Sequence, residues 1–315
     1  MTLSPPLIGH LAMLTFSALV AFSFTFGSMV ANDVEPSVIT ALRFIIALAA
    51  MAVVARLWGM SLRFLKGRVW AWIVIGGLMA AYFITMFEAL ARTTALSTSA
   101  IFTLAPLMAA GFGWILLRLR TPPSTLAALV LGAIGALWVI FDGSLERLLR
   151  FDIGFGEALF FFGTLAHAAV PGMTRRLVPG VPSFEAATGT IFGALLVTVV
   201  YAIPDALTTQ FTALPLRVWL VALYLGLVTT ALSAFLIQVA IPRLPPGKVM
   251  AYTYLVPSWV ALHALARGQF EQGPLYIGVG LTLVALALLL GQDMRGGKGV
   301  GAAPRDRNIR NGEPQ

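Results

Sequence analysis

The sequence has no cysteine and very few charged residues. Without cysteine the chain has no disulfide and no thiolate chemistry, so the redox compartment cannot be inferred from it. Charged residues make up 11% of the 315 residues and hydrophobic residues 59%, whereas roughly a quarter of the residues in a soluble domain are charged. This composition excludes a soluble globular domain and indicates that lipid surrounds most of the chain.

Several chemical signatures are also missing. No nucleotide-binding loop of the form G-x-x-x-x-G-K-[ST] occurs, so direct use of ATP is not expected. His10, His167 and His263 are far apart, and there is no acid-rich motif. We therefore expect no cofactor, no metal and no catalytic residue. The net charge of +8 does not indicate a nucleic-acid partner, because the basic residues lie in short loops and in the C-terminal tail.

Long apolar runs dominate what is present. A helix that crosses a bilayer needs about 20 apolar residues, and ten such runs appear between charged or Pro/Gly-rich breaks. They are Leu7–Val30, Ser37–Leu57, Val69–Leu90, Thr93–Leu117, Ser124–Phe141, Ile153–Met173, Ser183–Ile203, Leu216–Ile241, Pro246–Ala266 and Pro274–Gly291. The sequence predicts an all-α membrane protein with ten transmembrane helices.

The basic residues predict the orientation of these helices. When the loops are assigned alternately to two sides, most of the 21 Lys and Arg residues fall on one side, and Arg43 lies within a span. The other side receives only Arg92, Arg147, Arg150, Arg217 and Arg267. Because Lys and Arg concentrate on the cytoplasmic side, both termini are predicted to be cytoplasmic.

The two halves of the chain resemble each other. A shift of about 151 positions places Leu255-Val256-Pro257 over Leu104-Ala105-Pro106, and Pro36-Ser37 recurs as Pro182-Ser183. We interpret residues 1–150 and 151–292 as two five-helix repeats, followed by a disordered cytoplasmic tail over 293–315. Five helices per repeat is an odd number, so the second repeat is inverted relative to the first, an arrangement that many secondary transporters share.

The two helices with central prolines are the best candidates for a substrate cavity. A proline within a helix frees a backbone carbonyl and lets the helix loosen. In the fourth span a polar face accompanies the proline, and its counterpart in the ninth span is rich in aromatic residues. With His167 of the sixth span, these give the predicted cavity residues: Ser99, Thr103, Pro106, Tyr252, Tyr254, Pro257, Trp259 and His167.

Charged and polar residues inside the spans are candidates for coupling or gating, each with a structural alternative. Arg43 either pairs with Asp33 or Glu35 or snorkels to the interface, or else it contacts an anionic substrate group. Glu88 is expected to pair with Arg92 at i+4 rather than to carry protons. Gln238 and Lys248, near the cytoplasmic end, either form an inner gate or anchor the chain at the interface. His167 is either a proton relay or a packed residue.

The order and spacing of these features resemble the drug/metabolite transporter superfamily, and its EamA-type branch most of all. The resemblance rests on the ten spans, on Arg43-Phe44 in the second, on Ala89-Leu90 closing the third, and on the prolines of the fourth and ninth. It implies a carrier of the bacterial inner membrane that exports amino acids, other metabolites or toxic compounds. The implied cavity is lined by helices one, three, four, six, eight and nine. The sequence departs from the family where Gly-Glu usually follows each proline helix, with Leu117-Arg118 and Gly268-Gln269 instead.

These observations together predict a multi-pass secondary transporter. We expect it to export amino acids or other small neutral or amphipathic metabolites by alternating access. A membrane channel or facilitator is the alternative, and a membrane-embedded enzyme is less consistent with the scattered histidines. The expected partners are a small-molecule substrate and the lipid bilayer. We expect a monomer, with a dimer as the alternative.

Overall fold

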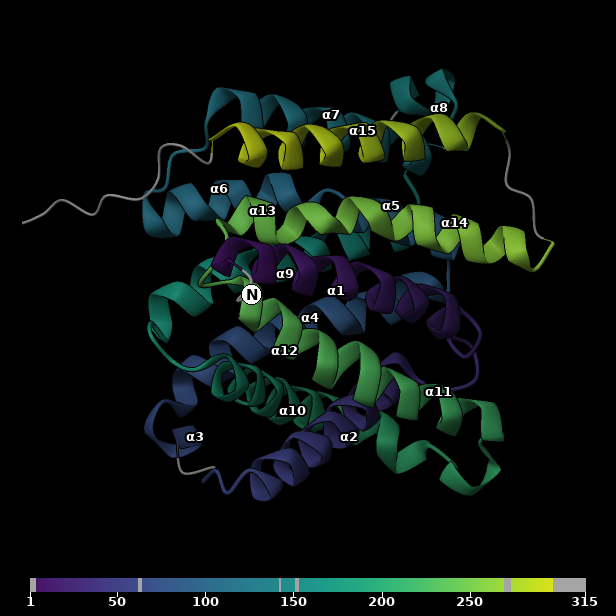
Figure 1. The fold of residues 1–315 in the computed structure, drawn as a ribbon. Helices are drawn as coiled ribbons and strands as arrows, with labels where there is room; N and C mark the ends of the chain where they lie inside the picture. Colours follow the sequence, from purple (N-terminus) through teal and green to yellow (C-terminus); the bar gives the residue numbers. More distant parts are fainter. Residues whose placement is uncertain (1–3, 62–63, 142, 151–152, 269–272, 297–315) are drawn as a thin grey trace, which may run out of the picture.

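The chain forms a bundle of helices that lie side by side along a common direction. The computed structural model describes residues 4–61, 64–141, 143–150, 153–268 and 273–296, which form helices and loops with no strand. The first helix, α1 (Pro5–Ser28), begins at the same end of the bundle at which the last, α15 (Gly273–Gly296), ends (Figure 1). We call this end the terminal side and the other end the opposite side.

Five long helices besides α1 and α15 are continuous. Most of them begin at or beside a proline, whose missing N–H would have no partner in the first turn of a helix. They are α2 (Pro36–Leu57), α4 (Val69–Leu90), α7 (Pro123–Ile140), α9 (Phe155–Leu177) and α10 (Ser183–Thr208). Three short elements lie in the connections: α3 (Phe64–Gly67), α8 (Leu145–Arg150) and η1 (Phe211–Ala213).

Three further rods are interrupted. The first consists of α5 (Ala95–Phe102) and α6 (Ala105–Leu117), and the second of α13 (Pro246–Ala251), the 3₁₀ segment η3 (Tyr252–Leu255) and α14 (Val256–Ala266). Pro106 is the second residue of α6 and Pro257 the second residue of α14, so both prolines lie where the preceding α-helix has ended. The third rod comprises α11 (Leu216–Gly226), the π-helical segment η2 (Leu227–Leu232) and α12 (Ser233–Ala240).

Eight of the described helical rods are long and apolar enough to cross a membrane. The predicted spans Ile153–Met173 and Pro274–Gly291 correspond to α9 and α15, which are not among the eight. α9 carries Glu157 in its first turn and Arg175 and Arg176 in its last, and the apolar run described within α15 is shorter. α15 continues to Gly296, so the predicted tail boundary at residue 293 is too early. Residues 297–315 of that predicted tail lie outside the described residues.

The helices pack in pairs that join the two halves of the chain. α4 contacts α9 and α10, α1 contacts α12 and α14, and α2 contacts α10 and α11. Three more pairs are α6 with α9, α6 with α13, and α7 with α15. Each of these pairs takes one helix from each half, so neither half forms a separate globular unit.

Glycines allow α4 and α10 to approach until their backbones touch. A Cβ atom on Gly193 would lie 1.8 Å from the Trp72 carbonyl oxygen, and one on Gly76 would lie 2.1 Å from the Ala194 nitrogen. Small residues permit this distance between membrane helices, where packing rather than apolar burial drives association. The junction of the two halves therefore depends on the absence of side chains at these positions.

Two adjacent glycines of α4 provide a test of this close contact. Gly76→Ala should destabilise the protein by about 1–3 kcal/mol, because the new methyl group would overlap the backbone of α10. Gly77→Ala is the matched control: its Cβ would meet only Val197 Cγ2, at 3.7 Å. It should leave stability unchanged or raise it by up to about 1 kcal/mol through helix propensity. Thermal unfolding of the two purified variants in detergent measures the difference, and equal midpoints would contradict the packing argument.

Candidate functional site

A buried arginine of α2 lies at the centre of the bundle. The side chain of Arg43 has 0% exposure. Its Nε donates a hydrogen bond to Thr230 Oγ1 and its Nη2 donates one to Thr229 Oγ1, both at 2.9 Å. The two threonines belong to the π-helical segment η2 of the other half of the chain. The guanidinium is therefore held by neutral hydroxyl groups that lie far from it in sequence.

The π-helical turn places both threonines at the guanidinium. The hydroxyls of Thr229 and Thr230 donate to the same carbonyl oxygen, Leu225 O, at 3.1 and 2.7 Å. A regular α-helical turn aligns residue i with i+4, whereas the wider π turn also aligns i with i+5, so two consecutive side chains can share one acceptor. Both hydroxyl oxygens then remain available to accept hydrogen bonds from Arg43.

Aromatic rings cover one face of the guanidinium. Arg43 Cζ lies 3.6 Å from the ring centroid of Phe83 and 6.0 Å from that of Phe87, both on α4. The negative face of an aromatic ring attracts a cation, and more strongly where water is excluded. Arg43 thereby connects α2 and α4 of the first half to η2 of the second.

No carboxylate neutralises this charge. Among the described residues Arg43 forms no ion pair, and its Nη1 has no hydrogen-bond partner. The prediction that Asp33 pairs with Arg43 is wrong, since Asp33 binds Arg217 at 2.7 and 2.8 Å. Neither does any described contact join Arg43 to Glu35. The positive charge is therefore buried without an acidic counterpart, an arrangement that is costly within a membrane protein.

A small cavity, which we call the central cavity, lies beside Arg43. Its volume of about 10 Å³ is enough for roughly one water molecule. Arg43 is not itself in the cavity wall, but two of the residues that touch the guanidinium, Phe83 and Thr230, are. The wall consists of aromatic, aliphatic and hydroxyl side chains: Phe16, Val20, Phe44, Met79, Tyr82, Phe83, His167, Ile191, Thr230, Ser233, Ala234 and Ile237.

Polar atoms without partners gather around this cavity. Tyr82 Oη and His167 Nδ1 are both buried and have no hydrogen-bond partner, and the two rings lie against each other with centroids 4.4 Å apart. Buried polar groups in folded proteins are nearly always hydrogen-bonded, so each exception calls for an explanation. Together with Arg43 Nη1, these atoms indicate a site built to contact something polar.

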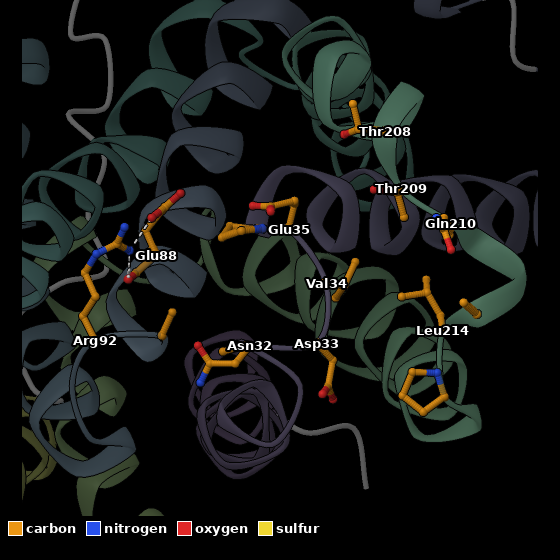
Figure 2. Close-up of a pocket in the computed structure, with 15 residues that line it drawn as sticks. Asn32, Asp33, Val34, Glu35, Glu88, Arg92, Thr208, Thr209, Gln210 and Leu214 are labelled. Carbon is orange, nitrogen blue, oxygen red and sulfur yellow. Dashed lines mark hydrogen bonds and ion pairs between the residues drawn. The ribbon is translucent and has the colours of Figure 1, made fainter.

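On the opposite side, a larger pocket opens between the ends of α1, α4 and α10. We call this pocket of about 750 Å³ the vestibule. Figure 2 shows Glu88 bonded to Arg92 on one side of it, with Glu35 between them and the chain near Thr209. The i,i+4 ion pair expected between Glu88 and Arg92 is present. The pair is at the surface, so it stabilises the fold only weakly.

A thin layer separates the vestibule from the central cavity. On α4, Phe83 lines the cavity and Glu88 lines the vestibule, a separation of about 7.5 Å at the α-helical rise per residue. Phe87 lies between them and, with Phe83, faces the guanidinium of Arg43. The contact of Arg43 with the two phenylalanines therefore lies along the stretch of α4 between the two pockets.

Two adjacent arginines bind backbone carbonyls on the terminal side. Arg175 Nε donates to Ile241 O at 2.9 Å, and its Nη2 also contacts Leu244 O. Arg176 Nη1 donates to Leu116 O at 3.0 Å. These carbonyls lie at the C-terminal ends of α12 and α6, where backbone acceptors lack helical partners and a cation is favourable. The end of α9 is thus tied to one rod of each half.

Comparison with known proteins supports a transporter. Residues 7–141 match the model of the EamA-like transporter family. The resemblance predicted from the sequence is confirmed over these residues. The match supports a multi-pass membrane transporter.

Two relatives extend the comparison over the whole chain. The uncharacterized transporter YyaM of Bacillus subtilis (strain 168) is 23% identical over 286 residues, which cover 89% of this chain and 92% of YyaM. A crystal structure described only as that of a protein superposes with a TM-score of 0.72 at 19% identity, covering 92% of this chain and 98% of the other. The second likeness shows that the fold is shared.

Of the predicted cavity residues, only His167 lines the central cavity in the described part of the chain. The others lie in the rods α5–α6 and α13–α14, which form none of its wall. The hydroxyls of Ser99 and Thr103 donate to carbonyls of their own helix, Leu96 O and Ala100 O. Pro106 and Pro257 are buried at the helix breaks.

The aromatic residues of the ninth predicted span make contacts elsewhere. Tyr254 Oη donates to Leu129 O of α7 at 2.9 Å, so this side chain faces away from the central cavity. Tyr252 Oη and His10 Nδ1 are 3.0 Å apart. Trp259 Nε1 lies 3.4 Å from Ser17 Oγ. In this conformation these residues hold α13–α14 against α1 and α7.

The two predicted gating residues of the second half occupy different places. Gln238 is buried and its Nε2 lies 3.4 Å from Thr190 Oγ1 on α10. Lys248 lines a separate groove on the terminal side, next to Arg120 and Pro122. Phe44, Tyr82 and Phe83 line the central cavity but were not predicted as cavity residues. In a sequence, an aromatic residue in a cavity wall looks the same as one in a packed core.

A double-mutant cycle tests whether Thr229 supports the charge of Arg43. Thr229→Val should destabilise the protein by about 1–3 kcal/mol, because it leaves a buried N–H group without an acceptor. In the Arg43→Met background the same substitution should cost much less, since no guanidinium remains to be satisfied. Unfolding in detergent measures all four proteins.

Thr198→Val is the matched control for this cycle. Thr198 is equally buried, but its hydroxyl bonds only to carbonyls of its own helix, Ala194 O and Leu195 O. The Thr198→Val substitution should lower the free energy of unfolding by the same small amount with or without Arg43. If Thr229→Val also costs the same in both backgrounds, the hydroxyl does not stabilise the guanidinium.

Proposed function

We propose that this protein is a secondary transporter that exports amino acids or other small neutral or amphipathic metabolites by alternating access. The observation that carries the proposal is the central cavity, whose volume of about 10 Å³ leaves no room for a solute in this conformation. Arg43 contacts Phe83 and Phe87 on the vestibule side of it, and Arg175 and Arg176 tie helices together at the terminal side. A carrier needs a site that opens to each side in turn, and a cavity that must widen before it admits a solute fits that cycle.

The pairing of the helices supports two inverted repeats over residues 1–150 and 151–292. If α1, α2, α4, α5–α6 and α7 correspond in order to α9, α10, α11–α12, α13–α14 and α15, each contact has a counterpart. The α4–α9 contact then corresponds to α1–α12, α4–α10 to α2–α11, and α6–α9 to α1–α14. The α2–α10, α6–α13 and α7–α15 contacts correspond to themselves. With a two-fold relation of this kind, the same rearrangement of helices can open either end of the bundle.

The matching breaks supply the places where the rods can bend. Pro106 and Pro257 occupy the same position relative to the break in their rods, and non-helical backbone at membrane depth is tolerated where protein buries it. Thr103 and Thr253, which lie at the two breaks, are both fully buried. Changes at these points would move one half of each rod while the other half stays in place.

The orientation and location follow from charge and kinship. The excess of Lys and Arg on the terminal side supports ten spans with both termini in the cytoplasm, and the B. subtilis relative supports a bacterial inner membrane. The vestibule would then face outward. The aromatic and hydroxyl wall of the central cavity suits a small solute with an apolar part and few charges.

Flux measurements test the transport proposal. We expect saturable uptake and counterflow from a mixed pool of amino acids and metabolites in proteoliposomes that contain the purified protein. Saturation is expected because the cavity must open to one side at a time, so each solute occupies the site for part of the cycle. Flux that rises with an imposed pH gradient would establish proton coupling, and flux indifferent to it would establish a facilitator or exchanger. Unsaturable flux would instead establish a channel and contradict the proposal.

The absence of cysteine permits a direct test of access to the cavity. We expect a cysteine that replaces Ser233, in the cavity wall, to react with a small methanethiosulfonate reagent about tenfold or more slowly than one that replaces the exposed Asn32 of the vestibule. The reason is that conformations open to the cavity are a minority. A transported solute should change the rate at Ser233→Cys and leave the rate at Asn32→Cys unchanged. Equal, solute-independent rates would exclude alternating access.

A further inference from the structure

We propose that Arg43 binds the carboxylate group of the transported solute. This inference rests on the proposed transport function and narrows its substrate class to molecules that carry a single carboxylate beside an apolar part. It follows from the charge of Arg43, from the donors that its neighbours leave free, and from the composition of the adjacent cavity.

The buried positive charge of Arg43 favours the binding of an anion. A buried cation in a membrane protein is usually paired with an acid or reaches the interface, and Arg43 does neither among the described residues. Thr229 and Thr230 supply hydroxyl dipoles, and Phe83 supplies the face of a ring. None of these neighbours carries a negative charge, so the site has a net positive charge next to a cavity.

The free donors form an edge that matches a carboxylate. A guanidinium has five N–H groups in one plane. Nε is used by Thr230, and one N–H of Nη2 is used by Thr229. Nη1 has no partner, which leaves its N–H groups beside the remaining N–H of Nη2. Two parallel N–H groups of this kind bind the two oxygens of a carboxylate.

The cavity wall limits the rest of the molecule. Phe83 and Thr230 contact the guanidinium and also line the central cavity, so a solute in the cavity would reach Arg43 as these two side chains part. In the described part of the chain no arginine or lysine is in the wall of the central cavity, so Arg43 is the one cation next to it, which favours a monoanion over a group with two negative charges. Tyr82 Oη and His167 Nδ1, which have no partners, are available to a second polar group such as an amine.

Matched solutes and variants test the proposal. The probes are phenylalanine and leucine, their amides, and the corresponding amines without a carboxyl group. Two readouts are used on the purified full-length protein: the shift of the thermal midpoint caused by each probe, and counterflow in proteoliposomes. For the wild type, we expect the apparent affinity for the carboxylates to exceed that for the amides and amines about tenfold or more.

Substitutions of Arg43 separate binding from folding. Arg43→Met should lose the preference for the carboxylate, and Arg43→Lys should retain part of it, because an ammonium keeps the charge but lacks the planar fork. Arg92→Met is the control, since Arg92 pairs with Glu88 in the vestibule. It should keep the preference. Elution as one species in size-exclusion chromatography establishes that each variant is folded.

The two readouts distinguish the ways in which the idea can fail. A midpoint shift that is specific for carboxylates and lost in Arg43→Met supports the site even if no probe is transported, in which case the proposed function fails alone. Transport of amides and amines at the rate of the acids overturns the carboxylate site and leaves the transporter standing. No midpoint shift with any carboxylate, or the same preference in Arg43→Met as in the wild type, also overturns the inference.

Discussion

The charge of Arg43 within an apolar bundle is the constraint on which the centre of this protein depends. Transfer of an unpaired guanidinium out of water is strongly unfavourable, and the chain offsets part of this cost with two threonine hydroxyls and a phenylalanine ring. These groups come from α4 and from η2 of the other half of the chain. The position of α2 relative to both elements is therefore fixed by the need to solvate one side chain, and the wall of the central cavity is fixed with it.

The backbone irregularities of the bundle follow the same logic. In a bilayer every backbone polar group needs a partner, so breaks in a helix occur where protein surrounds them. The π turn at Thr229 and Thr230 exposes two hydroxyl oxygens to Arg43, and the breaks before Pro106 and Pro257 are buried between neighbouring rods. The π turn provides hydrogen-bond acceptors for a charged side chain. Under the proposed function, the two breaks before the prolines are the points at which the rods bend. Close contact of α4 with α10 through Gly76 and Gly193 holds the halves together around them.

The sequence was sufficient for the helices but not for the site. Hydropathy located the long rods to within a few residues, because the requirement for about 20 apolar residues is local. The breaks could be anticipated, since proline acts on its own helix. The partner of Arg43 could not: Asp33 is near in sequence, yet Thr229 and Thr230 lie more than 180 positions away, and only packing brings them together. Tyr254 illustrates the opposite error, because a buried aromatic on a proline helix looks the same whether it faces a cavity or, as here, Leu129.

The energetic role of Arg43 also bears on why the residue is there. Replacement of a buried, incompletely satisfied charge by an apolar side chain of similar volume is often neutral or stabilising. The Arg43 charge therefore contributes little to the stability of the fold. The aromatic and hydroxyl groups around it reduce a desolvation cost that an apolar residue would avoid. A cost of this kind is understandable at a functional site, where stability is commonly given up for activity. Because the guanidinium contacts Phe83 of the cavity wall and Phe87, which precedes the vestibule residue Glu88, a solute that binds it would displace these side chains, and binding would be coupled to opening of the cavity.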